Sequence, residues 1–484
     1  MKKRLLFALS LLLCFTGFFA FFSCEKTQEV GSRYEINAEY SPQNQMLAGT
    51  VKLTYTHREE SEISVLKFAL YPNAYREDAA FSPVQKEMQA IAFYQGESFG
   101  EMVISSVHGA KNWEIEGEDE NILCAYLPQS LFYGDKIVLD IGFMVKLANV
   151  HHRTGVAQNA VNLGNFYPVL CGTKNGGFYE NAYYNLGSPF YHDFSNYTLH
   201  LKIPKEYTIA STGEIVSEKI LESKKEYTVS AMNVQDLGVV ASKNYKIAHL
   251  EHNGNNLRYY YYRDENPSET LLAAAECLDY FEQTFGQYPY PVYTLAQTGL
   301  CLESESYPAL CLLSEQLEKG AREKQIAVQT ARQWWGMCVG ANRVENAWQD
   351  IGLAEYSALC FFENYEKYGV KRETQVQEAL KEYRSYYDVY GSVLGRTDTA
   401  MTRHLKDFIG AYEYQCLEID KAIVMFDTLR KGVGEKSFFA GLKRYYKECA
   451  GQKVMAEHLI GAFERVDVDT NGFFHSFLGG KAIL

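Results

Sequence analysis

Histidine, the side chain that most often ligates a metal, is sparse in this sequence and is never paired at helical spacing. The chain has 484 residues and 11 His, and those beyond residue 246 are His249, His252, His404, His458 and His475. No two of these are four residues apart, the spacing that puts two ligands on one helix face. His151 and His152 are adjacent in a strand-like region, so they point to opposite faces. No nucleophile elbow, phosphate loop or dinucleotide fingerprint is present either.

The most specific pattern is a pair of amphipathic segments within Gln325–Phe362, joined by a polar loop. Apolar residues recur at helical spacing in both segments, which predicts two helices. The residue pattern resembles the active-site sequence of the aminopeptidase N family of zinc metallopeptidases. In that family one helix reads H-E-x-x-H-Q-W-W-G, and the next opens with W-x-[ND]-E-G-[FL]-A-x-Y. The matching residues here are Gln333–Gly336, Trp348, Asp350, Gly352, Leu353, Ala354 and Tyr356.

The resemblance does not extend to the residues that carry the chemistry. Alignment on Gln333–Trp335 puts Val328 and Arg332 at the two histidine ligands, Ile351 at the glutamate ligand and Gln329 at the general base. A catalytic zinc needs three ligands with lone pairs, which valine, isoleucine and a permanently charged arginine cannot supply. Glutamine cannot accept a proton from water. We therefore expect no metal and no other cofactor, although the family uses zinc.

The substrate loop of the family is also altered. Its glutamate, in G-x-M-E-[NY], captures the free amine of a peptide, and the corresponding position here is Ser306. Glu303 and Glu305 lie nearby, but they alternate in direction along a strand. We therefore regard all three as candidate cleft residues rather than as direct replacements.

The oxyanion donor of the family is a tyrosine on a later helix, and its position here falls on Ile419. A donor aimed at the oxyanion contributes several kcal/mol to catalysis, and isoleucine supplies none. Tyr412 and Tyr414 are close enough in sequence to provide a shifted donor.

Arg332 would project from the helix face that holds zinc in the family. A buried guanidinium must be paired or the fold is destabilised. We therefore predict that Arg332 replaces the charge of the metal and pairs with Glu355, Glu305 or Glu303.

The amino terminus reads as a targeting segment, residues 1–24. Lys2, Lys3 and Arg4 precede an apolar run from Leu5 to Phe22, as in an export signal. The F-F-S-C tetrad that ends at Cys24 resembles a bacterial lipobox, with Cys24 as the lipid attachment site; an uncleaved signal anchor is the alternative. With either the lipid attachment site or the signal anchor, the chain would be exported and anchored on the outer face of the cell membrane.

Composition excludes some partners. The formal net charge of -13 disfavours nucleic acid, whose phosphates require clustered Lys and Arg. Nine cysteines lie beyond the leader, and we expect them to be small buried residues, with Cys301–Cys311 as the nearest candidate disulfide.

The expected fold class is α+β. Alternating strands dominate from about Ser32 to Lys246, and a mostly helical pattern follows. Segments such as Leu66–Tyr75 and Asn233–Tyr245 resemble the amino-terminal β domain of the same family. The resemblance implies an antiparallel β-sandwich-like domain at residues 25–246, followed by a thermolysin-like peptidase domain at residues 247–484.

These observations favour an exported, membrane-tethered homologue of the aminopeptidase N family that is catalytically inactive. Through its former active-site cleft it would bind peptides or a protein partner. Two alternatives remain: an active zinc metallo-aminopeptidase with unrecognised ligands, and a purely structural surface protein. The volume of the cleft separates binding from scaffold, because only an open, polar-lined groove can receive a ligand.

Overall fold

Alternation of apolar and polar residues builds the largest sheet. In β1 (Ser32–Ser41), Tyr34, Ile36, Ala38 and Tyr40 are buried, and the residues between them are exposed, as a strand with one face on a core requires. The computed structural model describes residues 31–395, 397–466 and 470–482. Within them, this sheet has the order β15 (Glu214–Leu221), β16 (Lys224–Val234), β13 (Ser195–Pro204), β1, β2 (Met46–Thr56), β7 (Lys136–Lys146), β4 (Glu101–His108).

The sheet is not wholly antiparallel, in contrast to the sequence prediction. Strands β1 and β13 pair in parallel, with Ser32 opposite Ser195. More than 150 residues of chain separate these two strands, which allows the long crossover that a parallel pair needs in place of a hairpin. The other pairs in this sheet are antiparallel.

Two four-stranded sheets share a core with the large sheet. One has the order β10 (Val169–Leu170), β3 (Ile63–Ala69), β6 (Ile122–Leu131), β5 (Asn112–Glu116), and the other β14 (Thr208–Ser211), β17 (Gly238–Ser242), β9 (Val161–Gly164), β8 (Thr154–Val156). Two smaller pairs are β11 (Thr173–Lys174) with β12 (Gly177–Phe178), and β23 (Val339–Ala341) with β24 (Gln452–Val454). Within this β part, a short helix α2 (Gln89–Ala92) follows a helical turn at Lys86–Met88.

A five-stranded mixed sheet begins at Lys246, where the sequence pattern changes. Its order is β18 (Lys246–His252), β19 (Asn255–Tyr261), β20 (Tyr293–Thr298), β22 (Leu310–Ser314), β21 (Ser304–Tyr307). Strand β21 is therefore an edge strand, and helix α4 (Lys319–Arg332) packs beside it. This places the segment around Glu305 next to the end of α4.

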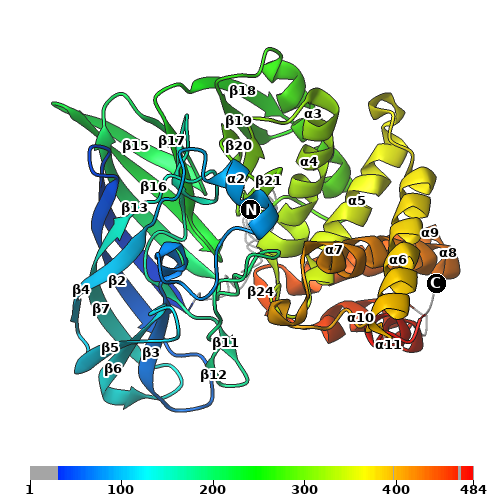
Figure 1. The fold of residues 1–484 in the computed structure, drawn as a ribbon, viewed down its shortest axis with the longest axis horizontal. Helices are drawn as coiled ribbons and strands as arrows, with labels where there is room; N and C mark the ends of the chain where they lie inside the picture. Colours follow the sequence, from blue (N-terminus) through cyan, green and yellow to red (C-terminus); the bar gives the residue numbers. More distant parts are fainter. Residues whose placement is uncertain (1–30, 396, 467–469, 483–484) are drawn as a thin grey trace, which may run out of the picture. The chain divides into compact units, whose positions relative to one another are not determined.

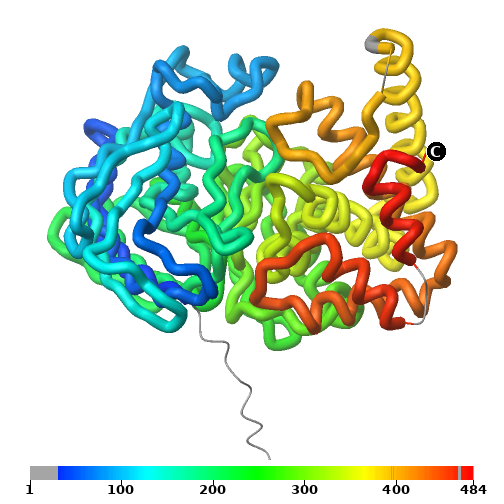
Figure 2. The backbone as a smooth tube through the Cα atoms, turned by 90° about the horizontal axis from the view of Figure 1, so that it is seen from below, coloured from blue at the N-terminus to red at the C-terminus, as the bar shows by residue number. Residues whose placement is uncertain are grey.

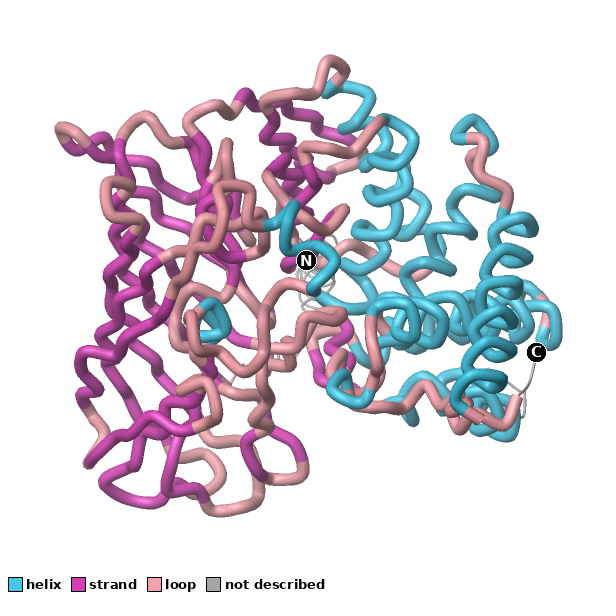
Figure 3. The backbone as a smooth tube through the Cα atoms, viewed as in Figure 1, coloured by secondary structure: helices cyan, strands magenta, loops and turns pink. Residues whose placement is uncertain are grey.

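Helices make up most of the remaining chain, as the sequence predicts, and Figures 1 and 3 show them gathered beside the five-stranded sheet. They are α3 (Pro267–Thr284), α4, α5 (Ile351–Asn364), α6 (Arg372–Leu394), α7 (Ala411–Tyr414), α8 (Lys421–Val433), α9 (Glu435–Cys449), α10 (Ala456–Glu464) and α11 (Asn471–Leu478). One apolar core contains residues of α3, α4, α5, α8, α9 and α10 together with the sheet. The architecture is α+β.

Residues Gly31–Leu484 form one compact unit, and Figure 2 follows the chain through it from the strands to the helices. The predicted division at residue 246 stays a prediction. All nine cysteines from Cys124 to Cys449 are buried free thiols, so the candidate Cys301–Cys311 disulfide is not formed. The predicted leader and Cys24 lie outside the described residues, and no helix within the described part is long and apolar enough to span a membrane.

Candidate functional site

Two tryptophans of the Q-W-W-G segment hold α4 against its neighbours. Helix α4 continues into a π-helical turn, η3 (Gln333–Cys338), in which Trp334 and Trp335 are completely buried. The indole N–H of Trp334 donates to the carbonyl of Gly286 at 2.9 Å, and that of Trp335 donates to Oγ of Ser357 at 2.9 Å. Since both buried indoles are satisfied, they fix the end of α4 against the chain that follows α3 and against α5.

The two motif glycines are required by close approach. A Cβ on Gly336 would overlap the carboxylate of Asp350, and a Cβ on Gly352 would overlap the carbonyl of Glu418. Glycine therefore lets Asp350 approach η3 and lets the start of α5 approach the π-helical turn η7 (Gln415–Asp420). These contacts explain locally why the motif frame is kept.

A pocket of about 300 Å³ opens beside the end of α4. Its walls come from α4, α5, η7, the segment around β21 and a loop that includes Tyr184 and Ser188. Residues singled out from the sequence that line it include Glu303, Glu305, Gln329, Arg332, Ile351, Glu355 and Ile419. Residues scattered over more than a hundred positions of sequence are thus brought to one cavity.

Two residues from the same set do not line the pocket. Ser306 was predicted as a cleft residue, but it is buried and its hydroxyl donates to Oε1 of Gln329 at 2.6 Å. Strand alternation turns Ser306 toward α4 when its neighbour Glu305 faces the pocket. Val328 packs in the apolar core.

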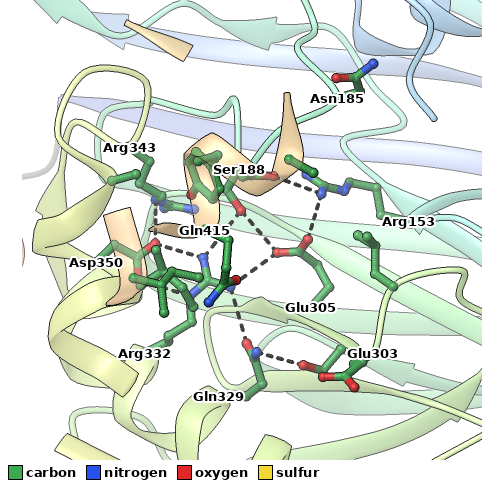
Figure 4. A pocket seen from close by; sticks show the side chains of 18 of the residues that line it. Arg153, Asn185, Ser188, Glu303, Glu305, Gln329, Arg332, Arg343, Asp350 and Gln415 are labelled. Carbon is green, nitrogen blue, oxygen red and sulfur yellow. Dashed lines mark hydrogen bonds and ion pairs between the residues drawn. The ribbon is translucent and has the colours of Figure 1, made fainter. Parts of the chain in front are cut away.

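Arg332 makes the densest set of polar contacts in the pocket (Figure 4). Its Nε donates to Oδ1 of Asp350 at 3.0 Å and its Nη2 to Oδ2 at 2.8 Å. Nη2 also donates to Ser188, and Nη1 donates to Gln329 and lies 3.5 Å from Oε1 of Glu305. Five N–H groups thus face five acceptors. Burial by itself lowers the pKa of Arg332, but the carboxylates of Asp350 and Glu305 raise it above its ordinary value.

The predicted partners of Arg332 need correction. Glu305 is in contact, but within the described chain Glu303 and Glu355 form no ion pair with Arg332. The principal partner is Asp350, which sequence reasoning did not name although it is part of the matched motif. Its position one residue before α5, facing the end of α4, was the available signal.

The ion pairs continue on both sides of Arg332. Glu305 also binds Arg153, with Nη2 at 2.8 Å from Oε2, and accepts a hydrogen bond from Ser188. Asp350 also lies 3.7 Å from Nε of Arg343. Sequence reasoning missed all three arginine and serine partners: Arg153 and Ser188 come from distant segments, and Arg343 lies in the loop between the two motif helices without being part of the matched motif.

These residues do not fit the zinc that the matched motif implies. Val328, Arg332 and Ile351 offer no lone pair to a cation, and the carboxylates nearest to Arg332 are already engaged by guanidinium groups. In the described residues there is no group of three His, Cys, Asp or Glu arranged to hold a metal ion.

The other side of the pocket carries acids and a tyrosine. Burial raises the pKa of Glu355 above its ordinary value, and it raises the pKa of nearby Asp420 to about 7. Tyr414 lines the pocket and Tyr412 does not, being about half exposed. Ile419 lines it too, with no polar atom to offer.

Comparison with solved structures identifies the fold of this chain. No family model and no curated protein matches the chain. The M1 zinc metallopeptidase from Deinococcus radiodurans is similar with a TM-score of 0.66 at 16% sequence identity, over 94% of this chain and 95% of that chain. The fold is that of the M1 zinc metallopeptidases.

Structures of variants of that M1 enzyme show the same degree of similarity to this chain. A glutamate-to-alanine variant, and the same variant bound to the substrate Tyr-Ser-Ala, each have a TM-score of 0.66 at 16% identity. Because these alignments cover 94% of this chain, the M1 likeness includes both the β part and the helical part. At this identity the fold alone is shared, and activity must be argued from the residues in the pocket.

Proposed function

We propose that this protein is a catalytically inactive member of the M1 structural group that binds peptides or a protein partner through the pocket beside Arg332. It is exported and tethered to the outer face of the cell membrane through Cys24 or an uncleaved anchor. The observation that carries the proposal is the guanidinium of Arg332, paired with Asp350 and Glu305 inside a pocket that is still open.

The ion pairs support loss of the metal chemistry. Placing a dication beside a saturated guanidinium would add repulsion where the carboxylates are already neutralised. Gln329 cannot accept a proton from a water molecule. Its Oε1 already accepts hydrogen bonds from Ser306 and Arg332. These side chains can neither bind the metal ion of a metallopeptidase nor act as its general base.

The pocket itself supports binding over a purely structural role. Its volume of about 300 Å³ is at the lower end of ligand sites. Its lining includes polar groups from both halves of the chain, among them Asn185, Glu303, Glu355 and Gln415. A scaffold that had lost its ligand would have no need to keep this cavity open.

The test combines metal content, hydrolysis and binding on one purified sample. We expect no stoichiometric zinc, no hydrolysis of aminoacyl arylamides, and measurable binding of Tyr-Ser-Ala by calorimetry. One zinc per chain with chelator-sensitive turnover would overturn the proposal in favour of an active enzyme. Absence of both turnover and binding over a panel of peptides would favour the structural alternative.

The proposed tether has its own test. Radiolabelled palmitate should be incorporated into the full chain, and Cys24→Ser should abolish labelling and release the protein from the membrane fraction. Labelling that persists in Cys24→Ser would contradict the lipid site. A Cys24→Ser protein that stays in the membrane without label would indicate an uncleaved anchor.

A further inference from the structure

The charges that line the pocket are not evenly satisfied. The three arginines in the wall, Arg153, Arg332 and Arg343, each have a carboxylate within 4 Å. Glu303 and Glu355 also line the wall, but among the described residues neither has an ion-pair partner. Glu303 accepts one hydrogen bond, from Gln325. The pocket wall therefore holds two carboxyl groups that have no positively charged partner among the described residues.

Asp420 does not line the pocket, but it contacts Gln415, which does. Its side chain is more than nine-tenths buried and accepts a long hydrogen bond from Gln415 at 3.4 Å. The charged groups that act on Glu355 and Asp420 come from every neighbouring element. They are Lys324 and Arg332 of α4, Glu303 before β21, and Glu382 of α6.

Tyr414 provides an independent sign that the pocket is built for a ligand. It is nine-tenths buried and lines the cavity, and its hydroxyl packs over Gly187. That hydroxyl makes no hydrogen bond to any described residue. Burial raises the pKa of Tyr414 far above the physiological range, so its hydroxyl is a neutral donor at the pocket wall that a ligand can use.

We propose that Glu303 and Glu355 in the pocket wall, with Asp420 beside them, bind the cationic group of the ligand in exchange for a proton, so that occupancy of the pocket is controlled by pH. This rests on the proposed binding function and adds its regulation. The proton leaves a buried carboxyl group for solvent, and an N–H of the ligand then donates to the ionised carboxylate. Tyr414 donates to an acceptor next to the cation.

Burial and mutual repulsion give the exchange its direction. Burial raises the pKa of Glu355 above its ordinary value and raises that of Asp420 to about 7, so near neutral pH the carboxyl group of Asp420 is partly protonated. A bound cation favours the charged form and lowers both pKa values. Exchange of one proton makes affinity fall by about tenfold per pH unit on acidification below the pKa.

The first experiment is calorimetry with Tyr-Ser-Ala as the probe. We expect its affinity to rise between about pH 5 and pH 8, and the heat to differ between buffers of different ionisation enthalpy, which reports proton release. N-acetylated Tyr-Ser-Ala should bind weakly and without pH dependence. Glu355→Gln should weaken binding and flatten the pH profile, whereas Glu366→Gln, at an exposed glutamate beyond α5, should behave as wild type.

The outcomes separate the inference from the proposed function. Binding of Tyr-Ser-Ala with the same affinity and no proton release at every pH would overturn the exchange and leave the binding function standing. A pH profile that is unchanged in Glu355→Gln and in Asp420→Asn would also overturn it.

A second experiment needs no ligand. A carboxyl whose pKa is raised on folding stabilises the protein at low pH, and this contribution is lost as pH rises through the folded pKa. Wild type should therefore lose thermal stability relative to Glu355→Gln as pH rises through the folded pKa of Glu355, and Glu366→Gln should not differ from wild type in this way. A difference between wild type and Glu355→Gln that stays constant with pH would reject the inference, even if no peptide binds.

Discussion

Arg332 and Asp350 form a two-point ion pair in which Nε and Nη2 of the guanidinium face the two oxygens of one carboxylate at 3.0 and 2.8 Å. The pair joins the last residue of α4 to the residue before α5. It is the planar fork geometry that arginine alone provides. In this chain the pair connects the two helices directly.

Asp350→Asn should be strongly destabilising. The variant keeps the shape of the side chain but leaves the buried guanidinium of Arg332 with only Glu305 for charge balance. Breaking a buried pair in this way costs about 3–5 kcal/mol, measurable by urea unfolding. Asp388→Asn, at an exposed aspartate of α6, should change stability by less than about 0.5 kcal/mol. A loss as small as that of the control would show that the pair contributes little.

Removing both partners should be less harmful than the single changes predict. Arg332→Met leaves Asp350 short of a cation, and Asp350→Leu leaves Arg332 short of an anion, but the double variant leaves neither. We expect a coupling free energy of about 1–3 kcal/mol in a double-mutant cycle. The recovery is partial, because Glu305 and Arg343 also lose a partner. Additive losses would indicate that the two side chains act independently.

Gly336→Ala tests the close approach of η3 to Asp350. The added methyl group would overlap the Asp350 carboxylate, so the ion pair must shift, at a cost of about 1–3 kcal/mol. Gly432→Ala is the matched control, since a Cβ there meets nothing within 4 Å and helix propensity should add about 0.5–1 kcal/mol of stability. If both variants are equally stable, the tight contact at Gly336 is not limiting.

Sequence patterns predicted the elements of this protein better than its contacts. The helices around Trp334 and Tyr356 follow from apolar periodicity, and the motif frame located the pocket wall through Arg332, Ile351 and Ile419. Local rules suffice for this, because periodicity and turn chemistry act within one segment.

The rest required the tertiary structure. Ser188 and Arg153 reach Glu305 from segments more than a hundred residues away, and no local pattern encodes that meeting. The parallel pairing of β1 with β13 was missed for the same reason. Asp350 was visible in the motif, but its role emerges only when Gly336 is seen to make room for it.

The folded state should lose stability as pH rises through the pKa of Glu418. Burial raises its pKa to about 8, although Oε2 accepts the backbone N–H of Trp348 at 2.7 Å. An unfolded glutamate titrates near about 4.3, so the contribution of Glu418 to stability is full below that pH and is lost as pH rises through about 8. Urea midpoints at several pH values should fall for wild type relative to Glu418→Gln as pH rises, while Glu366→Gln tracks wild type. Parallel curves for wild type and Glu418→Gln would mean that this carboxyl is ionised in the folded protein at neutral pH.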